Sequence, residues 1–424
     1  MHIIADLHIH SSYSRATSKD MNLDTLSLWA KVKGIDLLGT GDFTHPAHFA
    51  SIEEKLEPTG DGLFVLKNSN NPKKSNNPPI NFMLTAEVSN IYSEGGKTRK
   101  IHNLIFAPSL EAAKKINASF AKLGNITSDG RPIFGFSAKD LIKIVLDASP
   151  DCMLIPAHAW TPWFSIFGSK SGYNSIEECF GEYSKYIYAI ETGLSSNPQM
   201  NWRLSSLDNV TLISNSDAHS PSKLGREANV LDCKMDYFEI IDILKTKNNE
   251  KFLYTIEFYP EEGKYHSDGH RGCGILFSPE ETIKAGKRCP VCNRDVTVGV
   301  LSRVEELADR PEGFMPENAI PSKHLVPLEE ILAETFEVGV ASVKVQREYK
   351  RLTEEAGSEF NLLLHMDEDE ISTIAGPKVA EAILKVRNGD LSISPGFDGE
   401  FGKIKIFGRT EEIVPLGPQQ IGLF

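Results

Sequence analysis

Short apolar segments alternate with amphipathic, helix-like segments through residues 1–255. The apolar segments begin near residues 3, 35, 81, 102, 152, 188 and 210, and each has the length of a buried strand. This alternation predicts an α/β domain. One polar stretch, residues 67–79, has no periodicity and is expected to form a surface loop.

The pattern changes after about residue 255. A segment rich in Gly, Cys and His comes first, and the last hundred or so residues have a mainly helical pattern. Three parts are therefore predicted: an α/β domain over 1–255, a small module over 256–320 and a mainly helical C-terminal domain over 321–424.

Helix signals divide the C-terminal part. We expect a helix that begins near Pro327 and ends by Gly357, unless Gly339 interrupts it. A second helix is predicted over residues 376–387, and a short strand near residues 403–407.

The composition is that of an ordinary globular chain, with 424 residues, 40% hydrophobic and 24% charged. No apolar run approaches the length of a membrane span, about 18 residues, and the N-terminal segment lacks the features of a secretory signal. We therefore expect a cytoplasmic protein whose six cysteines are thiols or metal ligands, not disulfides.

The formal net charge of −13 disfavours a nucleic-acid-binding protein, because a phosphate backbone favours basic surfaces. Net charge does not fix local charge, however, and carboxylates that bind metal ions are neutralised by them. A nucleic-acid substrate therefore needs more specific evidence than composition.

Candidate metal ligands recur where the predicted strands end. Asp6, His8 and His10 alternate along the first strand and are expected to share one face. His102 differs, because it begins an apolar run. The other candidates follow later strands: Asp42, Glu87, His158, Glu191, Asp217 and His219. In a parallel α/β barrel the strand ends converge on one face, so these side chains are expected to lie close together.

Imidazole and carboxylate groups in this number predict a multinuclear metal site. Such mixed ligands suit ions like Zn²⁺ or Mn²⁺, with Mg²⁺ a further candidate, and eight or nine ligands are enough for about two or three ions. Clustered ions can bridge a phosphate, activate a water and stabilise the leaving oxygen. A single His or Asp at a strand end usually only forms hydrogen bonds, so the prediction depends on the joint pattern.

The motifs resemble those of the PHP (polymerase and histidinol phosphatase) phosphoesterases in order and spacing. The matching segments are Asp6-Leu-His-Ile-His-Ser, Glu87, His102, Pro156-Ala-His158 and Ser216-Asp-Ala-His219. The resemblance implies a distorted (βα)7 barrel. It also implies one ion held by four residues, which we predict to be catalytic: His8, His10, Glu87 and Asp217. Glu87 would bridge to a second ion held by His102 and His158, and a third position would involve Asp42 and His219.

Two positions depart from that family pattern. Many members carry Thr-Asp-His where this chain has Thr40-Gly-Asp42, so Asp42 would replace a histidine. The first motif often continues with Ser-Asp-Gly, whereas Arg15 follows Ser14 here, which removes one ligand and offers a cation for phosphate. The departures concern the third metal position above all.

A second ligand set lies in the middle module. His270-Arg-Gly-Cys273 and Cys289-Pro-Val-Cys292 form a zinc-knuckle pattern with one cysteine replaced by histidine, and His266 is the alternative fourth ligand. The Gly and Asn that follow each pair tolerate positive φ in a tight turn. Four ligands leave no open position, so we predict a structural Zn²⁺ site. The remaining cysteines are predicted to be ordinary buried thiols: Cys152, Cys179 and Cys233.

Over nearly its whole length the sequence resembles the endonuclease Q family. The resemblance rests on Gly-Thr-Gly-Asp-Phe-Thr-His-Pro (39–46), Tyr-His-Ser-Asp-Gly-His-Arg (265–271), the Cys-Pro-Val-Cys knuckle and residues 300–310. It implies a DNA repair endonuclease that nicks 5′ to deaminated bases (uracil, hypoxanthine, xanthine) or abasic sites and leaves a 3′-hydroxyl and a 5′-phosphate. The expected partner is damaged DNA, without a membrane, and the chain would associate with the nucleoid when on DNA.

Such an enzyme is expected to extrude the damaged nucleotide into a pocket. Deamination turns an amino donor into a carbonyl acceptor, so backbone N–H donors in that pocket would select the damaged base. Trp163 and Phe164, with Trp160 and Phe167 nearby, could stack on a base or wedge the duplex, although core packing is an equal alternative. The candidate phosphate contacts are Lys223, Arg226 and Arg15.

A motif in the C-terminal part also indicates DNA binding. Residues 371–387 resemble a shortened helix-hairpin-helix, a motif that presents backbone amides at a helix N-terminus to DNA phosphate. An ordinary amphipathic helix pair is an equal alternative, so residues 321–424 are a candidate DNA-binding domain.

Three other functions fit parts of the pattern. A small-molecule phosphatase of the histidinol-phosphate type would use the same barrel and ions, but needs neither the zinc knuckle nor the C-terminal domain. A 3′-exonuclease on the same barrel would degrade a strand progressively. A non-catalytic damage-binding module would hold less than one ion per barrel, which the near-complete ligand set disfavours.

Overall fold

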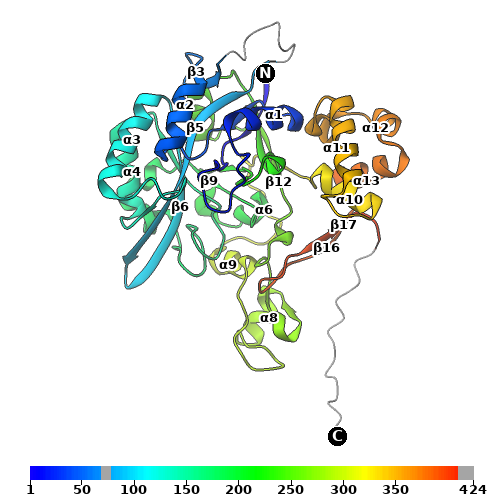
Figure 1. The fold of residues 1–424 in the computed structure, drawn as a ribbon. Coiled ribbons are helices and arrows are strands. Elements are labelled where there is room, and N and C mark those ends of the chain that lie inside the picture. The colour runs from blue at the N-terminus through cyan, green and yellow to red at the C-terminus, as the bar shows by residue number, and fades with distance from the viewer. Residues whose placement is uncertain (68–77, 409–424) are drawn as a thin grey trace.

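The strands that carry the predicted ligands surround the centre of the N-terminal part. In spatial order they are β1 (His2–Asp6), β2 (Leu37–Gly39), β5 (Asn81–Glu94), β6 (Lys97–Ala107), β8 (Met153–Pro156), β9 (Ala189–Glu191) and β10 (Thr211–Ile213). β1, β2 and β5 are parallel, β6 is antiparallel to both β5 and β8, and β9 pairs with β10 in parallel. The computed structural model, shown in Figure 1, describes residues 1–67 and 78–408. Most of the polar stretch expected to form a loop, residues 68–77, lies outside the described residues.

Backbone hydrogen bonds join the strand ends that are not paired as sheet. Ala159 N, after β8, donates to Glu191 O at the end of β9 (2.8 Å). His10 N, after β1, donates to Ala218 O beyond β10 (3.0 Å). The mixed α/β fold with a central, distorted arrangement of strands therefore agrees with the predicted fold class.

Further strands extend this sheet on either side, and helices cover it. Beyond β1 lie β11 (Ala228–Asp232), β12 (Phe252–Glu257) and β15 (Ser322–His324), and around β5 lie β3 (Leu56–Pro58), β4 (Phe64–Leu66) and β7 (Ile133–Phe134). The helices are α1 (Leu23–Lys33), α2 (Pro46–Lys55), α3 (Leu110–Leu123), α4 (Ala138–Ala148), α5 (Ile176–Phe180), α6 (Pro198–Asn201) and α7 (Tyr237–Thr246).

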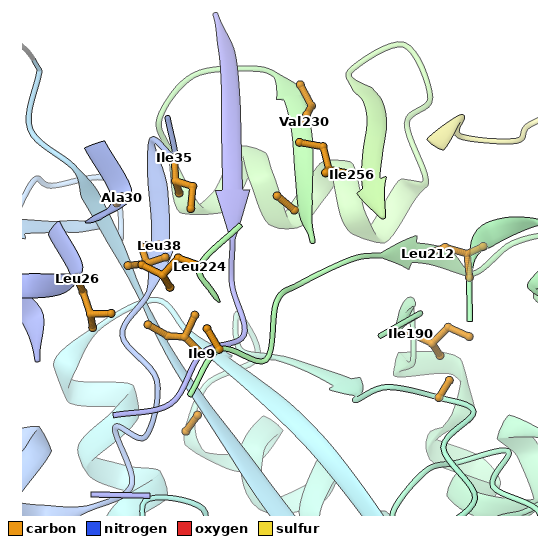
Figure 2. Close-up of a cluster of buried hydrophobic side chains, with 14 of the residues drawn as sticks. Ile9, Leu26, Ala30, Ile35, Leu38, Ile190, Leu212, Leu224, Val230 and Ile256 are labelled. Carbon is orange, nitrogen blue, oxygen red and sulfur yellow. The ribbon is translucent and has the colours of Figure 1, made fainter. Parts of the chain in front are cut away.

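Capping residues in the sequence define several helix starts. Ser137 caps α4 in a reciprocal capping box with Asp140, and Asp236 accepts hydrogen bonds from two amides of α7. The apolar sides of the helices pack on the strands, and Figure 2 shows Leu26 of α1 near Ile9 and Leu38. Each fully buried side chain of this kind contributes roughly 1.5–3 kcal/mol.

Two expectations about the strands were wrong. β1 ends at Asp6, so the alternation does not continue to His10, and the Asp6 carboxylate instead accepts backbone hydrogen bonds from Ser216 (3.0 Å) and Gly225 (2.9 Å). Glu87 lies in the middle of β5 and not at its end, because β5 continues into a long hairpin with β6. His102 is on β6, whose antiparallel direction brings the middle of that strand beside the same edge of the sheet.

The middle module projects from the rest of the chain (Figure 1) and contains β13 (Asp268–His270), β14 (Ile275–Phe277), α8 (Pro279–Lys284) and α9 (Val300–Leu307). Arg303 of α9 connects it to the N-terminal part, where it donates to the backbone oxygens of Phe167 (3.0 Å) and Tyr173 (3.0 Å). The module is therefore anchored next to the loop that follows β8.

The C-terminal part consists of α10 (Leu328–Phe336), α11 (Val343–Ala356), α12 (Glu368–Ala375), α13 (Pro377–Asn388) and the hairpin of β16 (Ser392–Ser394) and β17 (Lys403–Lys405). The helix predicted from Pro327 to Gly357 is thus two helices, because Glu337 ends α10 in a left-handed conformation and Ser342 caps α11. A buried ion pair joins this part to α1: Lys33 Nζ lies 2.6 Å from Glu359 Oε2. Among the described residues, no helix combines the length and apolar character of a membrane span.

Candidate metal centre and adjoining cavity

Four of the predicted ligands converge in a first group. His8, His10, Glu87 and Asp217 each offer an atom within 4.8 Å of the others. His10 Nε2 lies 3.1 Å from both Glu87 Oε2 and Asp217 Oδ1, and His8 Nε2 lies 3.6 Å from the same two oxygens. His8 Nε2, His10 Nε2 and Asp217 Oδ1 are buried without a hydrogen-bond partner, which is the condition expected of atoms that coordinate an ion.

A second group shares Glu87 with the first. Glu87 Oε1 lies 2.6 Å from His102 Nδ1 and 3.1 Å from His158 Nε2, and these two nitrogens are 3.3 Å apart. Glu87 therefore directs one carboxylate oxygen into each group. This is the arrangement required of a carboxylate that bridges two ions, and two imidazoles with carboxylates suit Zn²⁺ or Mn²⁺.

Hydrogen bonds to the opposite ring nitrogens orient three of the histidines. Glu191 holds His8 Nδ1 at 3.0 Å, Asp42 holds His10 Nδ1 at 3.1 Å, and the Ser165 hydroxyl lies 3.1 Å from His158 Nδ1. A partner at Nδ1 leaves Nε2 of the neutral ring unprotonated and aimed into the group.

The electrostatics of the two groups differ. Burial lowers the pKa of His8 and His10, but Glu191 and Asp217 around His8, and Asp42 and Asp217 around His10, raise the net pKa of both well above the usual range. Burial lowers the pKa of His102 to about 4. An ion that binds the first group must therefore displace protons from these imidazoles, whereas burial favours the neutral form of His102.

The backbone at the site is strained. His158, Asp42 and Asp217 have φ values of 30°, 42° and 47°, and all are non-glycine residues in the left-handed region. Strain of this kind persists only where the surroundings hold the backbone in place, and it concentrates at functional sites.

The two residues predicted for a third metal position lie beside the first group and outside both. Asp42 directs Oδ1 at His10, while its Oδ2 accepts from the backbone N–H and hydroxyl of Ser11 (2.6 Å each). The His219 ring lies 4.4 Å from that of His10, with Nδ1 2.8 Å from the Asp217 backbone oxygen. The geometry gives Asp42 a positioning contact to His10, and a third metal position remains a prediction.

The zinc-knuckle residues also come together. His270, Cys273, Cys289 and Cys292 offer ligand atoms within 4.8 Å of one another, and His266 is not in the group. Gly274 and Asn293, which follow the two pairs, have φ values of 64° and 57°, as expected for tight turns. The geometry thus favours His270 over His266 as the fourth ligand. The other three cysteines are buried.

A cavity of about 680 Å³ adjoins the second group. Trp163, Phe164, Arg226, Tyr265 and Phe401 are among its lining residues, which come from all three parts of the chain. The Phe164 ring lies 4.7 Å from that of His102, so the cavity begins beside a candidate metal ligand. Trp163 is 40% exposed here, whereas Trp160 and Phe167 are core residues at 1% each.

The predicted phosphate contacts lie in different surroundings. Arg226 lines the cavity and donates from Nε to the Ser216 backbone oxygen (2.9 Å), one residue before Asp217. Lys223 is paired with Glu330 of α10 (2.9 Å), so part of its charge is neutralised. Arg15 is largely exposed, with Nε 3.2 Å from Asp129 Oδ2.

Sequence reasoning missed two groups at the centre. Glu191 was recognised as a strand-end acid, but its role in holding His8 was not. Arg131 gave no signal, and its Nη1 donates to Glu87 Oε2 at 2.9 Å. It follows a short Ser-Asp-Gly turn far from every predicted motif, so only the fold brings it to the site.

The chain is similar to known proteins over most or all of its length. Its residues 327–390 match the family model of the MJ0043 C-terminal domain. The YqxK protein of Bacillus subtilis is 31% identical over 420 residues, which covers 95% of this chain and 99% of YqxK. The MJ0043 protein of Methanocaldococcus jannaschii is 35% identical over 254 residues, which covers 58% of this chain and only 31% of that protein's own length.

Solved structures decide the family. The lesion-specific endonuclease PfuEndoQ from Pyrococcus furiosus matches with a TM-score of 0.84 and 30% identity, covering 97% of this chain and 96% of that one. The chain belongs to the endonuclease Q family. A second endonuclease Q structure, a complex with a 27-mer duplex that has an abasic lesion at its active site, matches with a TM-score of 0.82 and 30% identity over 100% of both chains. The likeness therefore extends over residues 256–320 and the C-terminal helices as well as the N-terminal part.

Proposed function

We propose that this chain is a metal-dependent DNA repair endonuclease that nicks the phosphodiester on the 5′ side of a damaged nucleotide. The observation that carries the proposal is the position of the aromatic cavity, which begins beside the second ligand group. Uracil, hypoxanthine, xanthine and abasic sites are the proposed lesions. Membership of the endonuclease Q family supports a damaged-DNA substrate, because a family structure contains an abasic duplex.

Two divalent ions are proposed for the ligand groups, Zn²⁺, Mn²⁺ or Mg²⁺, and a third position is proposed near Asp42 and His219. The catalytic residues are His8, His10, Glu87 and Asp217, which would hold the first ion, and Glu87 would also serve the second. Bound ions would lower the pKa of a water molecule and neutralise charge on the phosphate. The proposed hydrolysis adds water to phosphorus and breaks the bond to O3′, which takes up a proton and leaves as the 3′-hydroxyl, and the phosphate stays on the 5′ end of the damaged nucleotide.

The cavity is proposed to receive the extruded nucleotide. Its volume of about 680 Å³ is within the range of small-molecule sites. Trp163 and Phe164 offer apolar faces for stacking, worth about 1–3 kcal/mol per base. Arg226, which lines the cavity and donates to the backbone oxygen of Ser216 next to Asp217, is suited to a phosphate of the damaged strand.

The three parts of the chain have separate proposed roles. Residues 1–255 form the phosphoesterase, residues 256–320 the module with a structural Zn²⁺, and residues 321–424 a DNA-binding domain. The hairpin between α12 and α13 supports the last role, because Gly376 precedes α13 at φ 74° and no side chain caps the first amides of that helix.

The test is a nicking assay on duplexes labelled on one strand and containing a single uracil, hypoxanthine or abasic site, with Mn²⁺ or Mg²⁺. A single cut immediately 5′ of the lesion is expected, with none in an undamaged duplex. Asp217→Ala should abolish the cut, since it removes a ligand of the first group.

A matched pair of aromatic variants tests the cavity. Trp163→Ala is expected to slow cleavage of the uracil duplex about 10- to 100-fold through lost stacking. Phe238→Ala, which truncates an aromatic of similar exposure on α7, should not. Progressive shortening of the strand would indicate a 3′-exonuclease. Turnover of a small phosphomonoester without any cut in damaged DNA would refute the proposed substrate.

A further inference from the structure

We propose that Arg131 is a catalytic residue of this centre and that its guanidinium binds the phosphate under attack. Arg131 Nη1 donates to Glu87 Oε2 at 2.9 Å, and that same oxygen lies 3.1 Å from His10 Nε2 in the first ligand group. The guanidinium is therefore in contact with the carboxylate around which both groups are built. This inference rests on the proposed nuclease function and adds a residue that binds the reacting group.

The loop that carries Arg131 is held tightly against the centre. Asp129, itself 6% exposed, accepts from the backbone N–H of Arg131 (3.2 Å) and of Arg15 (3.4 Å). Gly130 N donates to Tyr13 O (3.0 Å), and Thr44 Oγ1 donates to Gly130 O (3.1 Å). Both sides of the turn are thus fixed to segments that flank the first ligand group.

Close packing at Gly130 and the strand that follows complete this support. A Cβ at Gly130 would collide with the Asp42 carboxylate and the Ser14 hydroxyl, so the loop can approach the centre only as glycine. β7 begins two residues after Arg131 and pairs with β5 at Ser89, two residues beyond Glu87. Arg131 is consequently anchored from both sides of its turn and has little freedom to turn away from Glu87.

The donors of Arg131 exceed the acceptors that the protein offers them. A guanidinium has five N–H donors in a fixed fork. Within residues 1–67 and 78–408, Glu87 Oε2 is its only hydrogen-bond acceptor, and the side chain keeps 28% of its surface exposed. Spare donors beside a carboxylate-rich centre match the oxygens of a phosphate, which arginine binds in bidentate fashion.

A purely structural role for Arg131 explains less. An arginine that only neutralised Glu87 would not need to leave most of its donors without an acceptor in the described residues. It would also compete with an ion for Glu87 Oε2, since both are cations that bind the same oxygen. A phosphate at the centre removes this conflict, because its oxygens give the guanidinium an anion of its own.

The experiment compares full-length wild type with Arg131→Gln, Arg131→Lys and a charge-matched control, Lys143→Gln, which alters an exposed side chain on α4. Three quantities are measured for each: metal content by elemental analysis, affinity of the manganese-loaded protein for inorganic phosphate by calorimetry, and the single-turnover rate on an abasic duplex. Arg131→Gln is expected to keep its metal content, to bind phosphate at least about tenfold more weakly, and to cut about 10²- to 10³-fold more slowly. Arg131→Lys should recover part of both losses, and the control should match wild type.

Two results would overturn the inference. If Arg131→Gln loses bound metal as well as cleavage rate, Arg131 is only a positioning residue for Glu87. If Arg131→Gln keeps phosphate affinity and cleavage rate within about threefold of wild type, Arg131 has no role in phosphate binding or catalysis. If wild type itself fails to cut damaged DNA, the proposed function fails, but the phosphate titration still decides whether Arg131 binds the anion.

Discussion

Replacement of Asp42 by Asn distinguishes a carboxylate that positions His10 from one that binds an ion. Asp42 Oδ1 faces His10 Nδ1, and Oδ2 accepts from the Ser11 backbone N–H, the Ser11 hydroxyl and the Ser14 hydroxyl (2.9 Å). An amide cannot reproduce this arrangement, because one of its two positions is an NH₂ donor.

Either orientation of the amide leaves a mismatch. If the NH₂ faces His10, it donates to Nδ1 and moves the ring proton to Nε2, the atom that faces the first ligand group. If the NH₂ faces Ser11, it meets a backbone N–H. A buried mismatch of this kind costs about 1–3 kcal/mol. Loss of a partner that orients a metal-binding histidine lowers metal affinity about 10- to 100-fold, which is about 1.4–2.7 kcal/mol.

The assay is a Mn²⁺ titration against a fluorescent chelator, with ion stoichiometry from elemental analysis at saturation. Asp42→Asn is expected to reach the stoichiometry of wild type, with affinity about 10- to 100-fold lower. Asp36→Asn, a carboxylate outside both ligand groups whose Oδ2 accepts from Ile4 N, is the matched control. Unchanged affinity would refute the positioning role. Saturation at one ion fewer than wild type would show instead that Asp42 is a ligand of the third position.

Three further predictions follow from the charges and ligands of the structure. Metal binding should weaken as pH falls, because His8 and His10 have raised pKa values and must lose protons, and calorimetry in buffers of different ionisation enthalpy should detect proton release near pH 7. Burial raises the pKa of Glu257 to about 8. The stability that protonated Glu257 contributes is therefore complete below its unfolded pKa and is lost as pH rises through 8. Glu257→Gln should for this reason raise the melting temperature more at pH 9 than at pH 6. Equal shifts in melting temperature at the two pH values would contradict this. Cys289→Ser should lose the structural Zn²⁺ but keep the ions of the barrel, and elemental analysis that found both lost would refute independent sites.

The convergence of the candidate ligands was largely predictable from the sequence, because its signal is local. His8 and His10 lie two residues apart, and Asp217 and His158 each follow a short apolar run. Backbone geometry directs such residues to one edge of the sheet whatever the surrounding residues are. The zinc-knuckle ligands were predictable for a similar reason, since each pair is held by one tight turn.

One of the two expectations that failed, that Asp6 shares a face with His8 and His10, also has a local cause. Alternation predicts a shared face only while the strand continues, and β1 ends at Asp6. Two backbone amides from the segment beyond β10 donate hydrogen bonds to the Asp6 carboxylate. The sequence near residue 6 does not predict these contacts.

The sequence alone therefore determined the α/β class and which candidate ligands converge in the ligand groups and in the zinc knuckle, because each depends on short-range spacing. Tertiary structure decided which acid orients which histidine, that Glu87 faces two groups, and that Arg131 reaches it from a turn 44 residues away. It also decided that the cavity wall combines Trp163, Tyr265 and Phe401 from three parts of the chain. These relations depend on packing between segments far apart in sequence, and the hydrophobic pattern of each segment constrains only its own buried face.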